Sequence, residues 1–225
     1  IKKKRFISLF RCQAVPMGNS EETNGYLVGY NCGMAVEVET AGIHKTITAM
    51  HKEQQISISL GDMVIFAVAQ SLPAFPEFNG FFSGSLTTYP SINLAYSINL
   101  GKGPRKVVLQ NTNKLSLLEI SKAVKMFAFK YMRDELTAGD GEKGTISILN
   151  LSFFNPQMVI TPLFVKQAAL ITIAAEHDTV KVVDGKVLPK KAFNLCLAYD
   201  VRVADCQRAL QFLNAVKKVL EEKEI

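Results

Sequence analysis

The chain has 225 residues, of which 48% are hydrophobic, and a formal net charge of +6. This length and composition suit one sizeable core, and we expect a single core domain. No apolar run approaches the roughly 20 residues that a membrane helix needs, so the sequence predicts no membrane association. The basic residues are scattered and show no stripe interleaved with aromatic side chains, which argues against nucleic acid binding.

The four cysteines are widely spaced and form no pair at metal-ligand spacing; they are Cys12, Cys32, Cys196 and Cys206. This pattern predicts no metal site and favours a reducing compartment. Residues 1–20 contain the cluster Lys2-Lys3-Lys4-Arg5, which we interpret as a basic arm or the end of a linker. Residues 21–225 are then the core domain.

The first half of the chain alternates between strand and helix patterns. Residues 34–39 alternate apolar and acidic side chains, which predicts a strand, and residues 40–54 carry a helical stripe. Residues 60–72 are apolar nearly all round, as in a buried helix. Residues 92–100 alternate again, and the glycine loop that follows lacks the Lys-Ser/Thr ending of a phosphate loop.

The second half begins with a capping box at Ser116, which predicts a helix starting at residue 117. A polar loop is expected at residues 137–144, and strand patterns follow at 145–151, 168–175 and 192–199. A hairpin is expected between residues 180–183 and 186–188, with its turn at Asp184-Gly185, and His177 falls on the connection before it. The last predicted helix has one apolar face, formed by Ala209, Phe212, Leu213, Val216 and Leu220. This order is too irregular for a doubly wound parallel sheet.

The segment from Tyr199 to Cys206 reads YDVRVADC, and it resembles the motif that opens with D-H-R and closes with D-G in the dihydrolipoamide acyltransferases of 2-oxo acid dehydrogenase complexes. Weaker blocks resemble the same family in the same order. They are FPEFNG at residues 75–80, the strand and helix starts at 107–111 and 115–120, and GTISILNL at 144–151. Together these blocks identify the chain as similar to the family's catalytic domain.

The resemblance implies a chloramphenicol-acetyltransferase-like α/β fold with two layers, a mixed sheet flanked by helices. It also implies trimers that build larger cores. In the family, the active site lies between neighbouring subunits and is reached by coenzyme A and by a lipoyl arm. A motif histidine removes the thiol proton, a serine of the TISN segment stabilises the oxyanion, and the second motif Asp or Asn assists.

Carried over residue by residue, both reactive side chains are missing. Val201 occupies the histidine position, and Leu149 occupies the serine position. The retained motif residues are Asp200, Arg202, Asp205 and Asn150. We expect Asp200 and Arg202 to hold the motif's shape and Asp205 to be a helix N-cap or a relic. The family's NPPE turn is replaced by residues 164–167.

Other side chains could replace the missing groups. His177, Cys206, His44 and His51 are candidate bases, although none lies at a position that the family uses. Cys206 opens a helix, which favours the thiolate. Ser147 is predicted to share a strand face with Leu149 and is the fallback oxyanion donor. For each, an ordinary packing, surface or loop role is the competing interpretation.

The sequence therefore predicts a non-catalytic subunit, similar to protein X of pyruvate dehydrogenase complexes, which helps to build the core of a 2-oxo acid dehydrogenase complex. We expect a homotrimer, or a mixed trimer with an active acyltransferase, in the mitochondrial matrix or the bacterial cytoplasm. It needs no cofactor, although coenzyme A and a lipoyl group are possible ligands. The alternatives are an acyltransferase with a displaced base and a module that binds coenzyme A or an acyl thioester.

Overall fold

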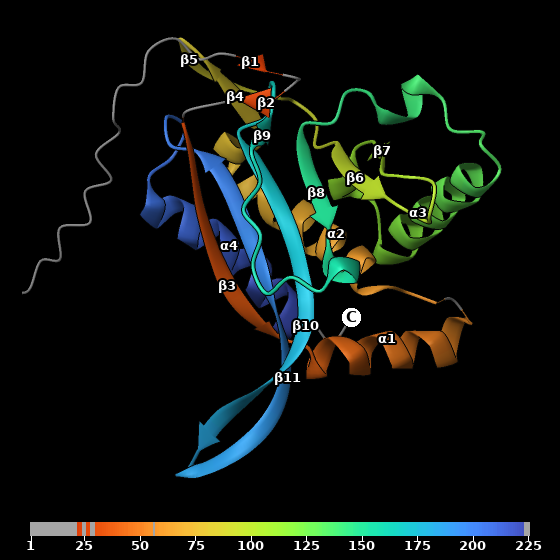
Figure 1. Cartoon of the computed structure of the whole chain (residues 1–225), viewed down its shortest axis with the longest axis vertical. Coiled ribbons are helices and arrows are strands. Elements are labelled where there is room, and N and C mark those ends of the chain that lie inside the picture. Colours follow the sequence, from red (N-terminus) through yellow and green to blue (C-terminus); the bar gives the residue numbers. More distant parts are fainter. Residues whose placement is uncertain (1–21, 24–25, 28–29, 56, 223–225) are drawn as a thin grey trace, which may run out of the picture.

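The computed structural model describes residues 22–23, 26–27, 30–55 and 57–222 (Figure 1). The basic arm, with Cys12, lies outside the described residues. The helices are α1 (Ala41–Gln54), α2 (Leu60–Ser71), α3 (Leu117–Met132) and α4 (Cys206–Glu222). The strands are β1 (Glu22–Thr23), β2 (Tyr26–Leu27), β3 (Asn31–Glu39), β4 (Gly80–Ser83), β5 (Ser85–Thr88), β6 (Leu94–Ile98), β7 (Arg105–Leu109), β8 (Ile146–Asn150), β9 (Leu163–Phe164), β10 (Ala169–Val183) and β11 (Lys186–Asp200).

The main sheet has six strands in the order β3-β11-β10-β8-β6-β7. The pairs β10/β8 and β8/β6 are parallel, whereas β3/β11, β11/β10 and β6/β7 are antiparallel. The sheet is therefore mixed, as expected. Two small sheets, β1-β2-β9 and β4-β5, lie at one end of it (Figure 1).

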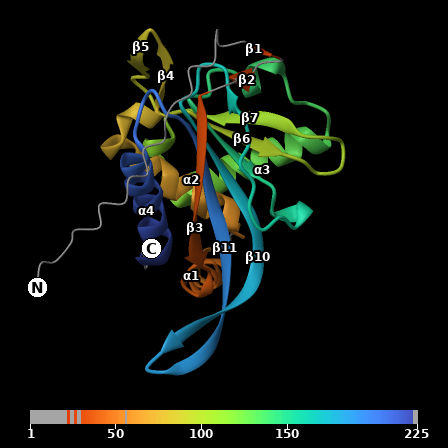
Figure 2. The ribbon, with the colours of Figure 1, turned by 60° about the vertical axis from the view of Figure 1, so that its left-hand side comes forward.

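Helices cover one face of the main sheet. Helix α4 packs against β3, β11 and α2, and α3 contacts α2 and β7. Figure 2 shows α4 and α2 on one side of the strands. The core between the layers is apolar and includes a cluster of Phe75, Phe78, Phe212 and Tyr199, in which Phe78 stacks on Phe212 with ring centroids 4.8 Å apart. This arrangement is the predicted two-layer α/β fold.

Local sequence signals explain where the helices begin. The Ser116 hydroxyl accepts the Glu119 N–H, and the Glu119 carboxylate accepts the Ser116 N–H, which is the predicted capping box. Ser59 and Asp62 form the same motif at α2. The five apolar residues predicted for the last helix are all buried in α4. The predicted loop at 137–144 contains a short 3₁₀ turn, Ala138–Gly141.

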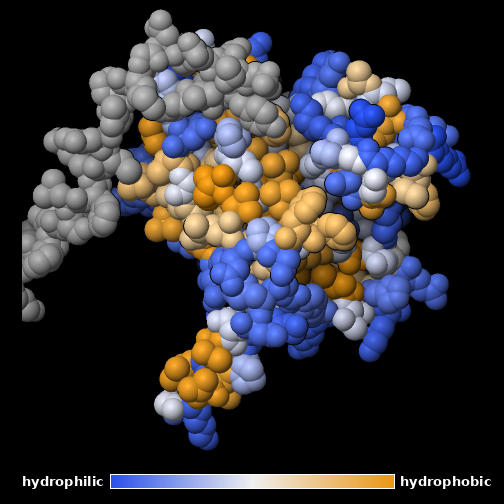
Figure 3. Space-filling model, in the orientation of Figure 1, coloured by the Kyte–Doolittle hydropathy of each residue, from blue (hydrophilic) through white to orange (hydrophobic). Residues whose placement is uncertain are grey.

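The hairpin of β10 and β11 is longer than the sequence indicates. The separate strand patterns at 168–175 and 180–183 form the single strand β10, with a register shift between Ile173 and Glu176. His177 therefore lies within β10 and not on a connection. The tip of the hairpin extends beyond the body of the molecule and exposes an apolar patch (Figure 3), formed by Val180, Val182, Val183, Val187 and Leu188.

Among the described residues, no α-helix packs over the second face of the sheet. A connecting segment crosses part of it: the Ala175 N–H donates to the Pro156 carbonyl, and the Asn194 side chain donates to the Gln157 carbonyl. The ribbon of this segment passes in front of β10 and β11 in Figure 1. The part of this face over β8, β6 and β7 carries the positions that matter for the site.

Candidate functional site

A buried ion pair fixes the turn that follows β11. The Arg202 guanidinium donates to both carboxylate oxygens of Asp200, with Nε–Oδ1 2.9 Å and Nη2–Oδ2 2.5 Å, and the Asp200 side chain is only 1% exposed. Its hydrogen bond to Asp200 raises the pKa of Arg202 above its ordinary value. The guanidinium also lies between the rings of Tyr30 and Phe82, 4.0 and 4.7 Å from their centroids. We call this pair the Asp200–Arg202 corner.

Val201 lies between these two residues. Its backbone N–H donates to the Tyr30 carbonyl at 3.0 Å, and its half-buried side chain packs against the main core. An isopropyl group has no lone pair and no titratable proton. At this position the chain therefore has a fixed backbone and no base.

Strand β8 presents alternate residues to opposite faces of the sheet. Ile146 and Ile148 belong to the core under the helices, whereas Leu149 packs with Leu163 and Leu170 on the second face. Asn150 points to the helix side, where its amide donates to the Tyr96 hydroxyl at 3.3 Å. Burial, opposed in part by that hydrogen bond, raises the pKa of Tyr96.

Ser147 shares the face of Leu149, as the alternation requires. It is buried, and its hydroxyl donates to the Gln167 side-chain oxygen at 2.7 Å, while Gln167 donates to the Gly144 carbonyl at 2.9 Å. The sequence pattern treats Gln167 only as part of an altered turn and gives no signal for this bond. Because its proton is engaged, Ser147 is a structural link in this structure.

Leu149 and Val201 are far apart within one chain. Leu149 pairs with Thr172 on β10, and Thr172 pairs with Cys196 on β11. Val201 follows Cys196 by five residues. Two strand spacings of about 4.8 Å and five residues of about 3.3 Å place Val201 roughly 19 Å from Leu149. A single chain therefore does not bring the two positions into one site.

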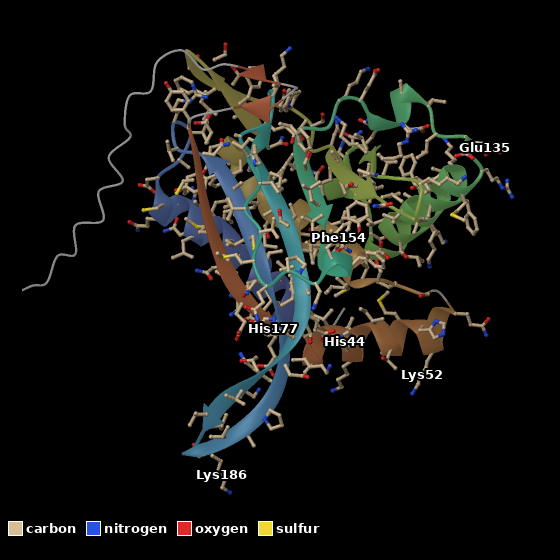
Figure 4. All side chains as sticks on the ribbon, in the orientation of Figure 1. His44, Lys52, Glu135, Phe154, His177 and Lys186 are labelled. Carbon is tan, nitrogen blue, oxygen red and sulfur yellow. The ribbon has the colours of Figure 1, made fainter. Side chains whose placement is uncertain are left out.

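The candidate bases lie elsewhere. His177 Nε2 is 3.9 Å from the Glu37 carboxylate, and His177 pairs with Ala192, nine residues before Val201, or roughly 30 Å along the strand. His44 lies on α1, and its Nε2 is 2.8 Å from Oε1 of Glu176 on β10. Figure 4 shows both histidines near the base of the hairpin. His51 is exposed near the end of α1.

Glu176 is the group that engages His44. Burial raises its pKa, but hydrogen bonds from Thr40 and His44 outweigh burial and leave the pKa of Glu176 below its ordinary value. A carboxylate held in the charged form explains why His44 is oriented toward the hairpin. This pair has a structural explanation.

The start of α4 holds the remaining candidates. The Asp205 carboxylate accepts the Arg208 N–H at 2.7 Å, which is the geometry of an N-cap and confirms that interpretation. Cys206 is exposed at the first position of the helix. Cys196 is buried in β11, where burial raises the pKa of its thiol. Among the described residues, no three His, Cys, Asp or Glu side chains are grouped to hold a metal ion.

A cavity of about 410 Å³ lies against the second face of the sheet beside Leu149. Its lining is mainly apolar and includes Leu149, Leu151, Phe164, Pro104, Ser97 and Lys106. A larger hollow of about 700 Å³ lies at the end of β6, next to Asn150, Phe153 and Phe154. The larger hollow lies at the carboxyl ends of the parallel strands β6 and β8, where α/β sheets place ligands.

Comparison with known proteins identifies the family. The sequence profile of the 2-oxoacid dehydrogenases acyltransferase (catalytic domain) matches residues 30–225. The chain belongs to this family. Among curated relatives, the dihydrolipoyllysine-residue succinyltransferase component of the 2-oxoglutarate dehydrogenase complex of Haemophilus influenzae is 29% identical over 173 residues, which is 76% of this chain and 42% of the relative.

The mitochondrial counterpart from Schizosaccharomyces pombe, a probable succinyltransferase component, is 28% identical over 177 residues, or 75% of this chain and 39% of the relative. The acyltransferase-family chain thus spans about two fifths of the length of these relatives. They come from a bacterium and from a mitochondrion. Within the described residues, no helix is long and apolar enough to cross a membrane.

Solved structures show the same fold. A probable dihydrolipoamide acetyltransferase from Listeria monocytogenes superposes with a TM-score of 0.81 at 26% identity and covers 87% of each chain. The dihydrolipoamide acetyltransferase of Azotobacter vinelandii superposes with a TM-score of 0.78 at 18% identity and covers 85% of this chain and 82% of its own. Chloramphenicol acetyltransferase superposes with a TM-score of 0.59 at 14% identity, over 85% of this chain and 88% of the chloramphenicol acetyltransferase chain. The predicted chloramphenicol-acetyltransferase-like fold is confirmed.

Proposed function

We propose that this acyltransferase-family chain is a non-catalytic subunit that helps to build the core of a 2-oxo acid dehydrogenase complex. The observation that carries the proposal is Val201, an aliphatic side chain held on a fixed backbone where the family motif has its histidine. The proposal extends family membership to a specific role.

The chemistry of the two replaced positions supports it. Loss of a general base costs roughly 10²- to 10⁴-fold in rate, and loss of one oxyanion donor roughly 10²- to 10³-fold. Val201 supplies no base, and Leu149 supplies no hydrogen-bond donor. What remains for catalysis is orientation of the two substrates.

Residue spacing supports the correspondence of these positions. In the Azotobacter vinelandii enzyme, the catalytic serine and histidine that were investigated are 52 residues apart, and the asparagine follows the histidine by four. Leu149 and Val201 are also 52 residues apart, and Asp205 follows Val201 by four. Asp205 is used as a helix cap in this chain.

The retained corner supports a role that depends on shape. The Asp200–Arg202 corner joins the end of β11 to Tyr30 and to Phe82 of β4. A buried, bidentate ion pair is costly to break, since it leaves an uncompensated charge. The chain thus keeps the framework around the reaction position and lacks the reacting group.

Two features support assembly. The apolar tip of the hairpin exposes Val182 and Val187 at 69% and 65%, which is typical of a surface that another chain covers. Leu149 and Val201 lie too far apart for one chain to unite them. We therefore propose a homotrimer, or a mixed trimer with an active acyltransferase, within a larger core.

The kind of complex is proposed only as a 2-oxo acid dehydrogenase complex. Relatives by sequence are named as succinyltransferase components of 2-oxoglutarate complexes, and the Azotobacter vinelandii structure is an acetyltransferase. The pyruvate complex predicted from the sequence stays a prediction, as does the mitochondrial matrix or bacterial cytoplasm. Coenzyme A and a lipoyl group remain proposed ligands, inherited from the family.

The alternative of an acyltransferase with a displaced base finds less support. His177 and His44 are engaged with carboxylates near the base of the hairpin, and Ser147 is engaged with Gln167. Cys206 is exposed and follows the motif turn, and it does not line the cavity beside Leu149. We therefore keep the structural role as the proposal.

Activity is the first test. The purified assembled protein is given acetyl-coenzyme A or succinyl-coenzyme A and dihydrolipoamide, beside an active family acyltransferase at equal concentration. We expect no turnover above the uncatalysed thiol reaction. Turnover within about 10²-fold of the active enzyme would overturn the proposal, because it would require a base.

Assembly is the second test. The chain is co-expressed with an active acyltransferase, and the complexes are weighed by native mass spectrometry. We expect a fixed ratio of the two chains, or a homotypic trimer. A Val182→Asp/Val187→Asp variant should lose assembly, because it places charges on cross-strand neighbours at the apolar tip. Lys186→Asp is the matched control at the same tip. A monomer in the unchanged chain would contradict the proposal.

A further inference from the structure

A polar pair borders the cavity beside Leu149. Ser97 on β6 pairs with Lys106 on β7, so the two residues are cross-strand neighbours on one face. The parallel register of β6 and β8 pairs Ala95 with Ser147 and Tyr96 with Ile148, and its continuation places Ser97 beside Leu149. Lys106, Ser97 and Leu149 therefore form a row across three strands, with side chains about 5 Å apart at the base.

All three residues line the same cavity of about 410 Å³. The rest of the wall is mainly apolar and includes Leu151 and Phe164; Ser147 also lines it, but its hydroxyl is already bonded to Gln167. This volume lies within the range of small-molecule sites, in which a mainly apolar wall carries a few convergent polar groups. The cavity thus has an apolar body and one polar end.

The polar end of the cavity presents two hydrogen-bond donors, Ser97 and Lys106. Within the described part of the chain, neither the Ser97 hydroxyl nor the Lys106 ammonium has a hydrogen-bond or ion-pair partner, and Lys106 Nζ is 5.8 Å from the centroid of the Phe164 ring. A cation beside a phenyl ring and a hydroxyl on the adjacent strand offer two donors to one incoming group. A carboxylate has two acceptor oxygens that match them.

We propose that this cavity binds short, unbranched aliphatic carboxylates. The carboxylate contacts Lys106 Nζ and Ser97 Oγ, and the hydrocarbon chain lies over Leu149, Leu151 and Phe164. The leucine that removes an oxyanion donor thereby supplies apolar surface for the ligand. Binding requires no turnover, so this inference does not rest on the proposed non-catalytic role.

Charge and lining decide the ligand class. The Lys106 ammonium balances a single negative charge and the Ser97 hydroxyl adds one neutral donor, whereas a phosphate group calls for several donors. Pro104, at the same wall, has no backbone N–H to offer. The apolar remainder of the wall favours a hydrocarbon chain over a polar one.

The test is isothermal titration of the assembled protein with butanoate, hexanoate and octanoate, and with octanol as the neutral probe. We expect affinity to increase roughly fourfold with each added methylene, as burial of apolar surface requires. Octanol should bind at least tenfold more weakly than octanoate. Absence of octanoate binding, or equal binding of octanol, would overturn the proposal.

Variants locate the site. Lys106→Met keeps the length of the side chain and removes its charge, and we expect octanoate affinity to decrease roughly tenfold or more with octanol unchanged. Ser97→Ala should reduce the affinity for octanoate severalfold. Arg105→Met is the matched control, because Arg105 is exposed on the same strand and points to the opposite face.

A filling variant separates this cavity from other surfaces. Leu149→Phe should weaken octanoate and octanol alike, since it occupies the space of the hydrocarbon chain. Thermal melting in the absence of ligand shows whether each variant is folded. Equal octanoate affinity in Lys106→Met, Leu149→Phe and the unchanged chain would place the ligand elsewhere and overturn the proposal.

Discussion

The Asp200–Arg202 corner, at the end of β11, differs in chemistry from the two replaced positions, Leu149 on β8 and Val201 in the turn after β11. At the corner, a carboxylate 1% exposed meets a guanidinium held between two aromatic rings. At Leu149 and Val201, aliphatic side chains pack against neighbouring apolar groups. The comparison shows that the framework of an active site and its reacting groups can be kept or lost separately.

The largest effect is expected when the reacting groups are put back. A Val201→His/Leu149→Ser variant supplies a base and an oxyanion donor on the retained framework, and acyl transfer to dihydrolipoamide should increase about 10³-fold or more. Each single variant should gain much less, because the two groups act as a unit. Rates are measured on the assembled protein.

Val201→Asn/Leu149→Ser is the matched control, since it is polar at residue 201 but has no base. If the double variant with histidine folds and assembles but gains nothing over this control, the corner does not preserve a competent framework. That result would contradict the comparison.

A smaller effect follows from breaking the corner. Asp200→Ala leaves the Arg202 guanidinium partly buried without its partner, and we expect the free energy of unfolding to decrease by about 3–5 kcal/mol. Urea denaturation measures it. Asp178→Ala is the control, because Asp178 is 86% exposed and its contact with Lys191 is on the surface, so its loss should cost at most about 1 kcal/mol. Equal losses would show that the corner is not a framework element.

The helix cap at Asp205 has a still smaller effect. Asp205→Ala removes the acceptor of the Arg208 N–H, and we expect a loss of about 1 kcal/mol in the free energy of unfolding. Ser116→Ala, at the cap of α3, should cost a similar amount. Asp205→Asn should restore most of the loss, because an amide oxygen also accepts the bond. No change in Asp205→Ala would exclude the cap.

Outside the motif, Asp140 makes the free energy of unfolding depend on pH in the acid range. The Thr137 backbone N–H, the Lys130 ammonium at 2.9 Å and the Thr137 hydroxyl donate to Asp140 and lower its pKa from 3.8 to about 2. The folded-state pKa is depressed, so the stabilisation is complete above about pH 4 and is lost as the pH decreases toward 2. In Asp140→Asn, the free energy of unfolding should therefore decrease less between about pH 4 and 2.

Urea midpoints between pH 5 and 2.5 measure this effect, with Asp134→Asn as the control on an exposed carboxylate. The corner variants should keep the Asp140 dependence unchanged, since the two regions share no contact among the described interactions. If the corner variants also alter the pH dependence produced by Asp140, the corner and Asp140 are coupled.

The sequence by itself determined where the long helices lie and which reacting groups of the family motif are missing. Capping at Ser116 and the apolar face of α4 are local signals, because the residues that interact lie three or four positions apart. The replacements at Val201 and Leu149 are likewise read directly from the order of motif blocks, and the family assignment followed from that order.

The tertiary structure decided which residues are neighbours. Strand pairing joins residues far apart in the chain, so no local pattern places Ser97 beside Lys106, ties Ser147 to Gln167, or merges two strand patterns into β10 with His177 inside it. It also set the separation of Leu149 from Val201, which depends on the register of three strands. Local chemistry is written in the sequence, whereas the distances that combine it into a site arise only when the sheet is paired.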